Sequence, residues 1–362
     1  MDIRELGSIR KEIDELDRQL ANLIEKRMEL VNLVAGYKKN HNIGVLDSSR
    51  EKEVINNVLS QVKNPELKES ISSIFQSIMD ISKEYQKKKI SINSGIKKYA
   101  LIGEKLSHSM SPKIHELYFK KANIEATYEL LELSRDEIPH VLTELSLKGY
   151  SGLNVTIPYK TEIMPFLDKL SDEAMRIGAV NTINLDGNFT GFNTDYFGFG
   201  RALSFYGAEV KGKKCAVLGS GGATRAVVSY LEDNGAELIS IVSRNADEAA
   251  NRYPGKPTIN ISEFKAEGYD IVINTTPVGM YPNTDKSPIN REQLIGAGFV
   301  MDLIYNPSET LLMKYAQELG IPNCNGLYML VAQAMSSQEI WQGKKIDDEI
   351  INQIYREISH EN

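Results

Sequence analysis

Cysteine is scarce in this sequence, and long apolar runs are missing from it. The two cysteines among 362 residues, Cys215 and Cys324, stand too far apart for a disulfide framework or a zinc motif. No apolar run approaches the length of a membrane span, and the charged, periodic N-terminus lacks the pattern of a signal peptide. These features favour a reducing compartment, so we expect a cytoplasmic protein without a membrane anchor or a metal site.

An excess of positive charge is also missing. The 42 Lys and Arg residues against 49 Asp and Glu residues give a net charge of −7, which disfavours general nucleic-acid binding. What is present is an ordinary globular composition, 41% hydrophobic and 25% charged, in a chain long enough for two or three domains. Small molecules are therefore the expected partners.

The first 89 residues have a helical pattern without strand signals. Apolar residues recur every three or four positions over residues 6–34, no proline interrupts them, and one helix of more than 30 residues is expected. A second helix is predicted near residue 48, capped by Asp47 or Ser48, and a third follows Asn64. Because so long a helix has no core of its own, a dimerisation bundle is one interpretation.

The cations of the long helix indicate a ligand site. Arg27 interrupts the apolar stripe. On a helical wheel Lys38 lies within roughly 20° of Arg27, so the two cations are on one face. Arg10 lies roughly 100° away and about 25 Å along the axis, so one helix cannot place Arg10 and Arg27 around one small ligand. An antiparallel partner helix would bring them together, which predicts a homodimer with shared pockets. Several guanidinium groups in one pocket suit a small dicarboxylate.

Residues 1–89 resemble the all-helical class of chorismate mutase. The resemblance implies a three-helix module in an intertwined dimer that converts chorismate to prephenate, with Arg10 supplied by the partner. The arginines would bind carboxylates, Lys38 and Gln86 would face the ether oxygen, and Glu51 would hold the ring hydroxyl. The matching residues are Arg10, Arg27, Lys38, Asp47, Arg50, Glu51, Ser82 and Gln86. Catalysis would come from positioning and charge stabilisation, chiefly by Arg27, Lys38 and Gln86.

After a polar, basic linker at 90–97 the pattern changes. Short β-like runs such as "YALIG", "GLNVTIP", "CAVLG" and "FVMDLIY" alternate with helical stretches, which predicts parallel α/β sheets. Ser109 and Ser111 follow the first strand, Lys160 follows "GLNVTIP", Asp195 lies at a predicted turn, and Gln333 lies on a helix. Lys160 and Asp195 are the acid/base pair that these strings offer.

As an ordered set, these strings resemble shikimate dehydrogenase from about residue 97 onward. The resemblance implies a two-lobed α/β enzyme that reversibly reduces 3-dehydroshikimate to shikimate. Its substrate lobe would span 98–198 with 330–362, and its Rossmann-like cofactor lobe 199–329. The alkoxide left by hydride delivery needs a proton, which Lys160 would supply beside Asp195. The implied substrate contacts are Ser109, Ser111, Asn154, Thr156, Lys160, Asn181, Asp195, Tyr305 and Gln333.

A glycine loop in "CAVLGSGGATRA" indicates nucleotide binding. It follows a strand and opens a helix, although Thr224 stands where the G-x-G-x-x-G pattern has its third glycine. Arg244 after the next strand favours NADP over NAD, whereas Asp247 and Glu248 weaken that preference. The expected cofactor contacts are Gly219, Ser220, Gly221, Gly222, Ala223, Ser243, Arg244, Asn245, Thr275 and Gly326.

Three alternatives stay open at this point. The helical module could be a dimerising or metabolite-sensing domain rather than a mutase. The α/β part could be a quinate/shikimate dehydrogenase that uses NAD, against which the Ser109 and Ser111 pair and Arg244 argue. A binding protein with a decayed site is disfavoured by the Lys160 and Asp195 pair.

Overall fold

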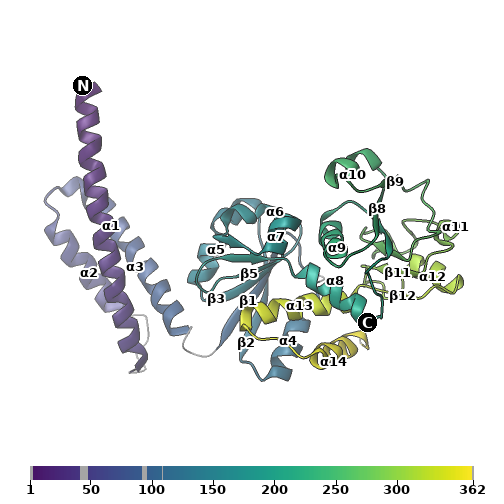
Figure 1. Cartoon of the computed structure of the whole chain (residues 1–362). Helices are drawn as coiled ribbons and strands as arrows, with labels where there is room; N and C mark the ends of the chain where they lie inside the picture. The colour runs from purple at the N-terminus through teal and green to yellow at the C-terminus, as the bar shows by residue number, and fades with distance from the viewer. Residues whose placement is uncertain (1–2, 41–47, 92–95, 108, 361–362) are drawn as a thin grey trace. The chain divides into compact units, whose positions relative to one another are not determined.

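The computed structural model describes residues 3–40, 48–91, 96–107 and 109–360, with the side chains of 3–5, 32, 35–40, 48–51 and 86–91 left out (Figure 1). The chain separates into two compact units, each considered by itself below. One comprises Met1–Lys98 with Thr143–Tyr150, and the other comprises Tyr99–Leu142 with Ser151–Asn362. The four-part division of the sequence at 89, 98, 198 and 330 stays a prediction.

The N-terminal unit is built from three helices, as predicted. They are α1 (Ile3–Asn40), α2 (Ser48–Gln61) and α3 (Lys68–Ser91), with a 3-10 turn at Pro65–Leu67 leading into α3. Asn64 caps that turn, since its side-chain oxygen accepts a hydrogen bond from the Glu66 N–H at 3.0 Å. α3 contacts both α1 and α2. The expectation of one helix longer than 30 residues is confirmed, because α1 has 38.

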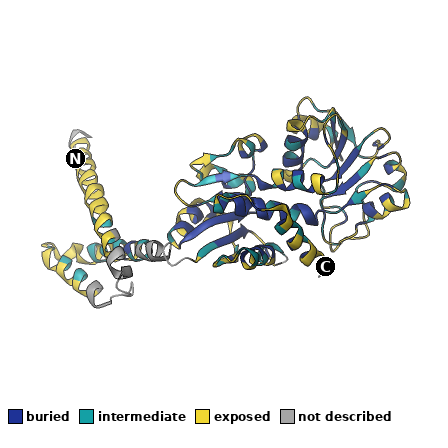
Figure 2. Ribbon diagram, turned by 60° about the horizontal axis from the view of Figure 1, so that its bottom comes forward, coloured by how far each residue is buried: buried dark blue, intermediate teal, exposed yellow. Residues whose placement is uncertain are grey.

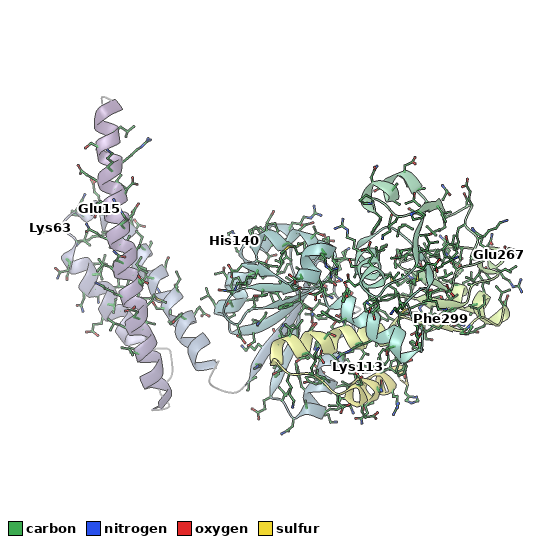
Figure 3. All side chains as sticks on the ribbon, viewed as in Figure 1. Glu15, Lys63, Lys113, His140, Glu267 and Phe299 are labelled. Carbon is green, nitrogen blue, oxygen red and sulfur yellow. The ribbon has the colours of Figure 1, made fainter. Side chains whose placement is uncertain are left out.

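The apolar stripe of α1 is exposed within this chain. Ile13, Leu16, Leu20 and Leu23 are each about half or more exposed, and the described part of the helix is mostly coloured as exposed in Figure 2. Charged side chains also project from this unit, among them the labelled Glu15 of α1 and Lys63 of the connection between α2 and the 3-10 turn in Figure 3. Burial is therefore concentrated elsewhere, in the strands and connecting helices of the second unit.

The first sheet of the α/β unit has strand order β2-β1-β3-β5-β6-β4. Its strands are β1 (Lys97–Gly103), β2 (Ala126–Glu132), β3 (Tyr150–Val155), β4 (Lys169–Leu170), β5 (Thr182–Asn184) and β6 (Thr190–Phe192). Its helices are α4 (Ser111–Ala122), α5 (Ile138–Leu147), α6 (Tyr159–Glu162) and α7 (Asp172–Ile177). β5 pairs antiparallel with both β3 and β6, so the prediction of a purely parallel sheet is wrong here. The Asp186-Gly187 turn accounts for the β5–β6 pair, because it reverses the chain into a hairpin.

The second sheet is parallel in all its recorded pairs, as predicted. Its order β12-β11-β10-β7-β8-β9 reverses direction between β7 and β10, which is the topological switch point of a doubly wound fold. The strands are β7 (Lys214–Leu218), β8 (Leu238–Ser243), β9 (Thr258–Asn260), β10 (Ile271–Asn274), β11 (Phe299–Asp302) and β12 (Asn323–Cys324). The helices are α9 (Gly222–Asp233), α10 (Ala246–Arg252), α11 (Arg291–Leu294) and α12 (Leu311–Glu318).

Two helices carry the chain between the sheets. α8 (Thr194–Phe205) leads from β6 to β7, and α13 (Leu327–Gln342) returns from β12 and is followed by α14 (Asp348–Ser359). α13 packs along α8, and its Trp341 indole donates a hydrogen bond to the Ile183 carbonyl at 2.9 Å. Asp195, the catalytic candidate at the start of α8, is thus on a helix that packs against a buried interior. Among the described helices, none is long and apolar enough to cross a membrane.

Candidate active sites

Lys160 and Asp195 meet in the α/β unit. The Lys160 Nζ lies 2.5 Å from Asp195 Oδ2, and both side chains are partly buried. Lys160 belongs to the single turn α6 that follows β3, whereas Asp195 lies in the first turn of the helix α8 rather than at the predicted chain turn. A carboxylate in the first turn is favoured by the helix dipole, which explains the difference. The structure therefore brings together the predicted acid/base pair.

Asn181 holds the second oxygen of Asp195. Its side-chain nitrogen donates to Asp195 Oδ1 at 2.9 Å, while its oxygen accepts from the Thr194 N–H at 2.7 Å. The hydroxyls of Thr182 and Thr194 also lie 3.2 and 3.1 Å from that oxygen. With the oxygen occupied in this way, the amide group can only present donors to Asp195. Asp195 is accordingly arranged as a carboxylate acceptor with Lys160 on its other oxygen.

Asn154 is buried and saturated by the protein. Its oxygen accepts from the Tyr128 hydroxyl at 2.8 Å, and its nitrogen lies 3.0 Å from the Thr182 hydroxyl and 2.9 Å from that of Ser337. The same nitrogen lies 3.1 Å from the Asn181 carbonyl. Its predicted role as a substrate contact stays a prediction. The observed bonds make it a brace between β3, β5 and α13.

The remaining predicted substrate contacts lie at element ends. Ser109 precedes α4, which Ser111 begins, and the Ser109 hydroxyl accepts from the Ser111 N–H at 3.2 Å. Thr156 follows β3, and a side chain at the neighbouring Gly103 would collide with its methyl group. Tyr305 and Gln333 are partly buried, and the Gln333 side-chain nitrogen donates to the Leu330 carbonyl at 2.8 Å. Within the described chain, none of these five residues is hydrogen-bonded to the Lys160 ammonium group, whose partner is Asp195.

The glycine loop lies at the switch point between β7 and β10. Gly219 has φ +114°, and an added Cβ would lie 2.7 Å from the Thr275 hydroxyl, so glycine is required there. Gly221 and Gly222 face open space, and α9 begins at Gly222. Backbone N–H groups at such a helix start bind phosphate, so the loop fits a dinucleotide.

The missing third glycine is replaced by a hydrogen bond. Thr224 is fully buried, and its hydroxyl lies 2.7 Å from that of Thr275, which donates to the Leu218 carbonyl at 2.8 Å. In the glycine version of the pattern the third residue permits close packing of helix on strand. Here Thr224 ties α9 to the segment after β10 instead. Ala223 is exposed beside it.

The predicted ribose and phosphate contacts follow β8. Arg244 is exposed, the Ser243 hydroxyl accepts from the Asn245 N–H at 3.2 Å, and the Asn245 side chain caps α10. Gly326 precedes α13, where a Cβ would lie 2.0 Å from the Leu303 carbonyl oxygen, so only glycine fits. These residues therefore lie at element ends on the same lobe as the glycine loop.

Arg252 connects the glycine loop to Glu248. Its guanidinium lies 2.5 Å from the Glu248 carboxylate and donates to the Ser220 carbonyl at 3.1 Å. Glu248, which is expected to weaken the preference for NADP, is thus paired with Arg252 next to the glycine loop. The sequence signal was available, since Arg252 follows Glu248 by four positions on a helix.

In the helical unit, two of the predicted chorismate contacts, Arg27 and Ser82, lie side by side. The Arg27 guanidinium donates to the Ser82 hydroxyl at 2.5 Å, and Ser82 is buried. Burial lowers the pKa of Arg27 below its ordinary value, because desolvation disfavours the charged form. Arg10 is exposed. The other predicted ligands lie outside the described side chains, namely Lys38, Asp47, Arg50, Glu51 and Gln86.

Comparison with known proteins covers both units. The family model for the shikimate dehydrogenase substrate binding domain matches residues 101–183, and that for chorismate mutase type II matches residues 9–87. The shikimate dehydrogenase (NADP(+)) of Clostridium beijerinckii is 44% identical over 262 residues, which are 71% of this chain and 96% of that protein. The chain belongs to the shikimate dehydrogenase family. Its N-terminal helices add a chorismate mutase module.

Solved structures agree with this assignment. A chorismate mutase/shikimate 5-dehydrogenase fusion protein from Clostridium acetobutylicum aligns at 44% identity with a TM-score of 0.71, covering 74% of this chain and 98% of that one. Shikimate 5-dehydrogenase from Thermus thermophilus, in complex with NADP(H) and shikimate, aligns at 31% identity with a TM-score of 0.66, covering 72% and 99%.

Sequence reasoning overlooked several supports of the shikimate dehydrogenase site. Tyr128, Thr182 and Ser337 come from β2, β5 and α13, and they meet through Asn154. Each is a common residue with no local motif, so the sequence offered no signal for them. Within the described residues, no group of three or more His, Cys, Asp or Glu side chains is placed to hold a metal ion.

Proposed function

We propose that this chain catalyses two reactions of aromatic biosynthesis. The α/β unit reversibly reduces 3-dehydroshikimate to shikimate with NADP(H), and the helical unit rearranges chorismate to prephenate. The observation that carries the first assignment is the Lys160–Asp195 pair, fixed by Asn181 on an enzyme fold with a glycine loop. Arg27 bonded to the buried Ser82 supports the second. A cytoplasmic location is part of the proposal.

Lys160 and Asp195 supply the proton chemistry of the dehydrogenase. The glycine loop would hold NADPH, which when bound would supply hydride to the substrate carbonyl, so that an alkoxide would need a proton. Lys160 donates a proton to that oxygen, and Asp195 keeps the ammonium group directed at it while accepting from the same hydroxyl. In the reverse direction Lys160 accepts the hydroxyl proton. Ser109 and Ser111 bind the substrate carboxylate at the start of α4.

NADP is the proposed cofactor. The glycine loop and the start of α9 would hold the pyrophosphate, and Arg244 would contact the 2′-phosphate. Arg252 supports this choice because it neutralises Glu248 and lies beside Ser220. The Thermus thermophilus and Clostridium beijerinckii relatives, which are named for NADP, support it further.

The mutase unit is proposed to work as a homodimer. The exposed apolar stripe of α1 is too extensive for a helix that stands alone in water, and it suits a second copy. Arg10 lies 17 positions before Arg27, about 25 Å along the helix, so an antiparallel partner would complete each pocket. Holding the dicarboxylate in its reactive conformer then accounts for the rate, without proton transfer.

Paired assays on the full chain test both halves. Lys38→Ala should reduce chorismate turnover by about a hundredfold or more and leave shikimate-dependent NADP reduction intact, because the lost cation would face the breaking ether. Lys160→Ala should do the reverse, with kcat reduced by about a hundredfold or more and the NADP affinity retained. Each variant is the folding control for the other. If either variant keeps both turnovers, the corresponding half of the proposal fails.

A further inference from the structure

A cavity lies in the α/β unit, outside the residues of the candidate active sites. Its volume is about 620 Å³, within the usual range for small-molecule pockets. None of its lining residues is among the predicted contacts of shikimate or NADP. The proposed function therefore leaves this cavity without an occupant.

The cavity lies along the helices that join the two sheets. Phe197, Gly200 and Ser204 line it from α8, and Glu339 and Ile340 line it from α13. Two positions along a helix correspond to roughly 200°, so Phe197 faces away from the side of α8 that carries Asp195. The cavity and the catalytic pair thus use different faces of the same helix.

Aromatic rings form much of the wall. Phe192 of β6, Phe197 of α8 and Tyr230 of α9 all line the cavity. Tyr230 is held in place by Phe199, with ring centroids 5.5 Å apart in a T-shaped arrangement. Gly200 is needed for this wall, because an added Cβ would lie 2.2 Å from the Tyr230 ring. A flat apolar body is the shape that such a wall favours.

Positive charge exceeds negative charge around the cavity. Arg201, Lys344 and Lys345 line it together with two carboxylates, Glu173 and Glu339. Glu339 is already neutralised, because Arg201 lies 2.8 Å and Lys345 3.3 Å from its oxygens and the chain donates a further N–H to it. Lys344 has no ion pair with any residue that the structure describes. A ligand carboxylate beside Lys344 would therefore complete the charge balance.

We propose that this cavity binds a small aromatic monoanion, at a site separate from those for shikimate and NADP. The aromatic body would lie against Phe197 and Tyr230, and the carboxylate would face Lys344. Because the occupant touches α8 and α13, which carry Asp195 and Gln333, it would act on the dehydrogenase from outside the substrate pocket.

Equilibrium dialysis of the full chain with naphthalene-1-carboxylate tests this site. One equivalent should bind per chain, and saturating shikimate and NADP should not displace it. Ser204→Trp, which fills the cavity from an exposed position on α8, should abolish binding. Lys344→Glu should raise the Kd about fivefold or more, and the uncharged naphthalene-1-methanol should bind similarly weakly. Lys265→Glu, an exposed lysine outside the cavity, is the matched control and should bind like the wild type.

Three results would overturn the proposal. Displacement by shikimate or NADP would place the probe in the sites proposed for those ligands, and binding that survives Ser204→Trp would place it elsewhere, for example on α1. An equal loss of affinity for the probe in Lys344→Glu and Lys265→Glu would mean that the net charge of the protein, and not a contact with Lys344, determines binding. Thermal unfolding followed by circular dichroism checks that each variant is folded.

Discussion

The amide of Asn181 shows how a single side chain can orient the groups of the candidate active site. Its oxygen is occupied by the Thr194 N–H and two hydroxyls, so its nitrogen must face Asp195. Asp195 then has one oxygen for Asn181 and one for Lys160. Such an arrangement costs no reorganisation during reaction, which is the property that favours catalysis in a preorganised site.

Asp302 is a second buried carboxylate, with a structural role. It ends β11 and accepts from Asn274 at 2.9 Å, from the Ile304 N–H at 3.1 Å and from the Thr310 hydroxyl at 2.7 Å. Burial raises the pKa of Asp302 from 3.8 to about 6, although these hydrogen bonds oppose the shift. The folded protein therefore binds this proton more tightly than the unfolded chain does.

A pH-dependent loss of stability follows from Asp302. The contribution of protonated Asp302 to the free energy of unfolding is complete below about pH 4 and is lost as the pH rises through about 6. Asp302→Asn should remove this dependence. The difference in the free energy of unfolding between the variant and wild type should therefore change by about 2 kcal/mol in favour of the variant from pH 4.5 to pH 7. Urea unfolding can be followed by the fluorescence of Trp341, the one tryptophan in the sequence, which lies in the same unit.

Asp270→Asn is a control of opposite sign for this measurement. The Lys214 N–H and the Lys213 side chain lower the pKa of Asp270, so its stabilisation is present at neutral pH and is lost as the pH falls. Asp270→Asn should therefore lose stability relative to wild type as the pH rises. A pH dependence in Asp302→Asn that matches wild type would show that Asp302 does not titrate as described.

At the scale of elements, α10 modifies what its sequence suggests about the cofactor. Asp247 and Glu248 in its first turn count against a phosphate, but Arg252 in its last turn pairs with Glu248 and reaches Ser220. The negative charge of Glu248 on this helix is thus balanced by Arg252 next to the glycine loop. Selection of NADP would then depend on Arg244 and Arg252 together.

Arg252→Ala should weaken NADP binding and leave NAD binding nearly unchanged. The variant loses a cation and frees the charge of Glu248, so we expect the KM for NADP to rise about five- to tenfold. Glu248→Gln should shift the preference towards NADP. Arg291→Ala is the control, because it breaks the Arg291–Glu318 pair of the same lobe and should change neither the KM for NADP nor that for NAD. Steady-state kinetics with both cofactors measure the ratio. An unchanged ratio in Arg252→Ala would exclude this role.

Elements with strong patterns could be predicted, and those set by tertiary contacts could not. The 38-residue α1 and the buried strands β7, β8, β10 and β11 have clear periodicity or continuous apolar runs. β5 and β6 have three residues each, too few for a pattern, and their hairpin makes the first sheet mixed. In the site, Lys160 and Asp195 stand in recognisable strings, whereas Tyr128 and Ser337 matter through a partner 26 and 183 positions away in the sequence.

The two units of the molecule differ in how far they bury their own apolar side chains. The α/β unit buries its own core, with Phe199, Val331 and Ile351 fully inaccessible. The helical unit leaves the apolar stripe of α1 in water, where Leu16 and Leu23 are more than 60% exposed. Burying such side chains contributes roughly 1.5–3 kcal/mol each. Self-association is therefore expected to be a property of the helical unit.

Leu16→Glu with Leu20→Glu should convert the proposed dimer into a monomer. Glutamate keeps the helix propensity but prevents burial of the stripe, and the mutase pocket loses the Arg10 supplied by the partner. Chorismate turnover should fall by about a hundredfold or more, and shikimate oxidation should remain. Lys11→Glu, about 180° from the centre of the stripe, should stay dimeric and active in both assays. Light scattering after size-exclusion chromatography measures the mass. A monomeric double variant with full mutase turnover would show that each helical unit has a complete pocket by itself.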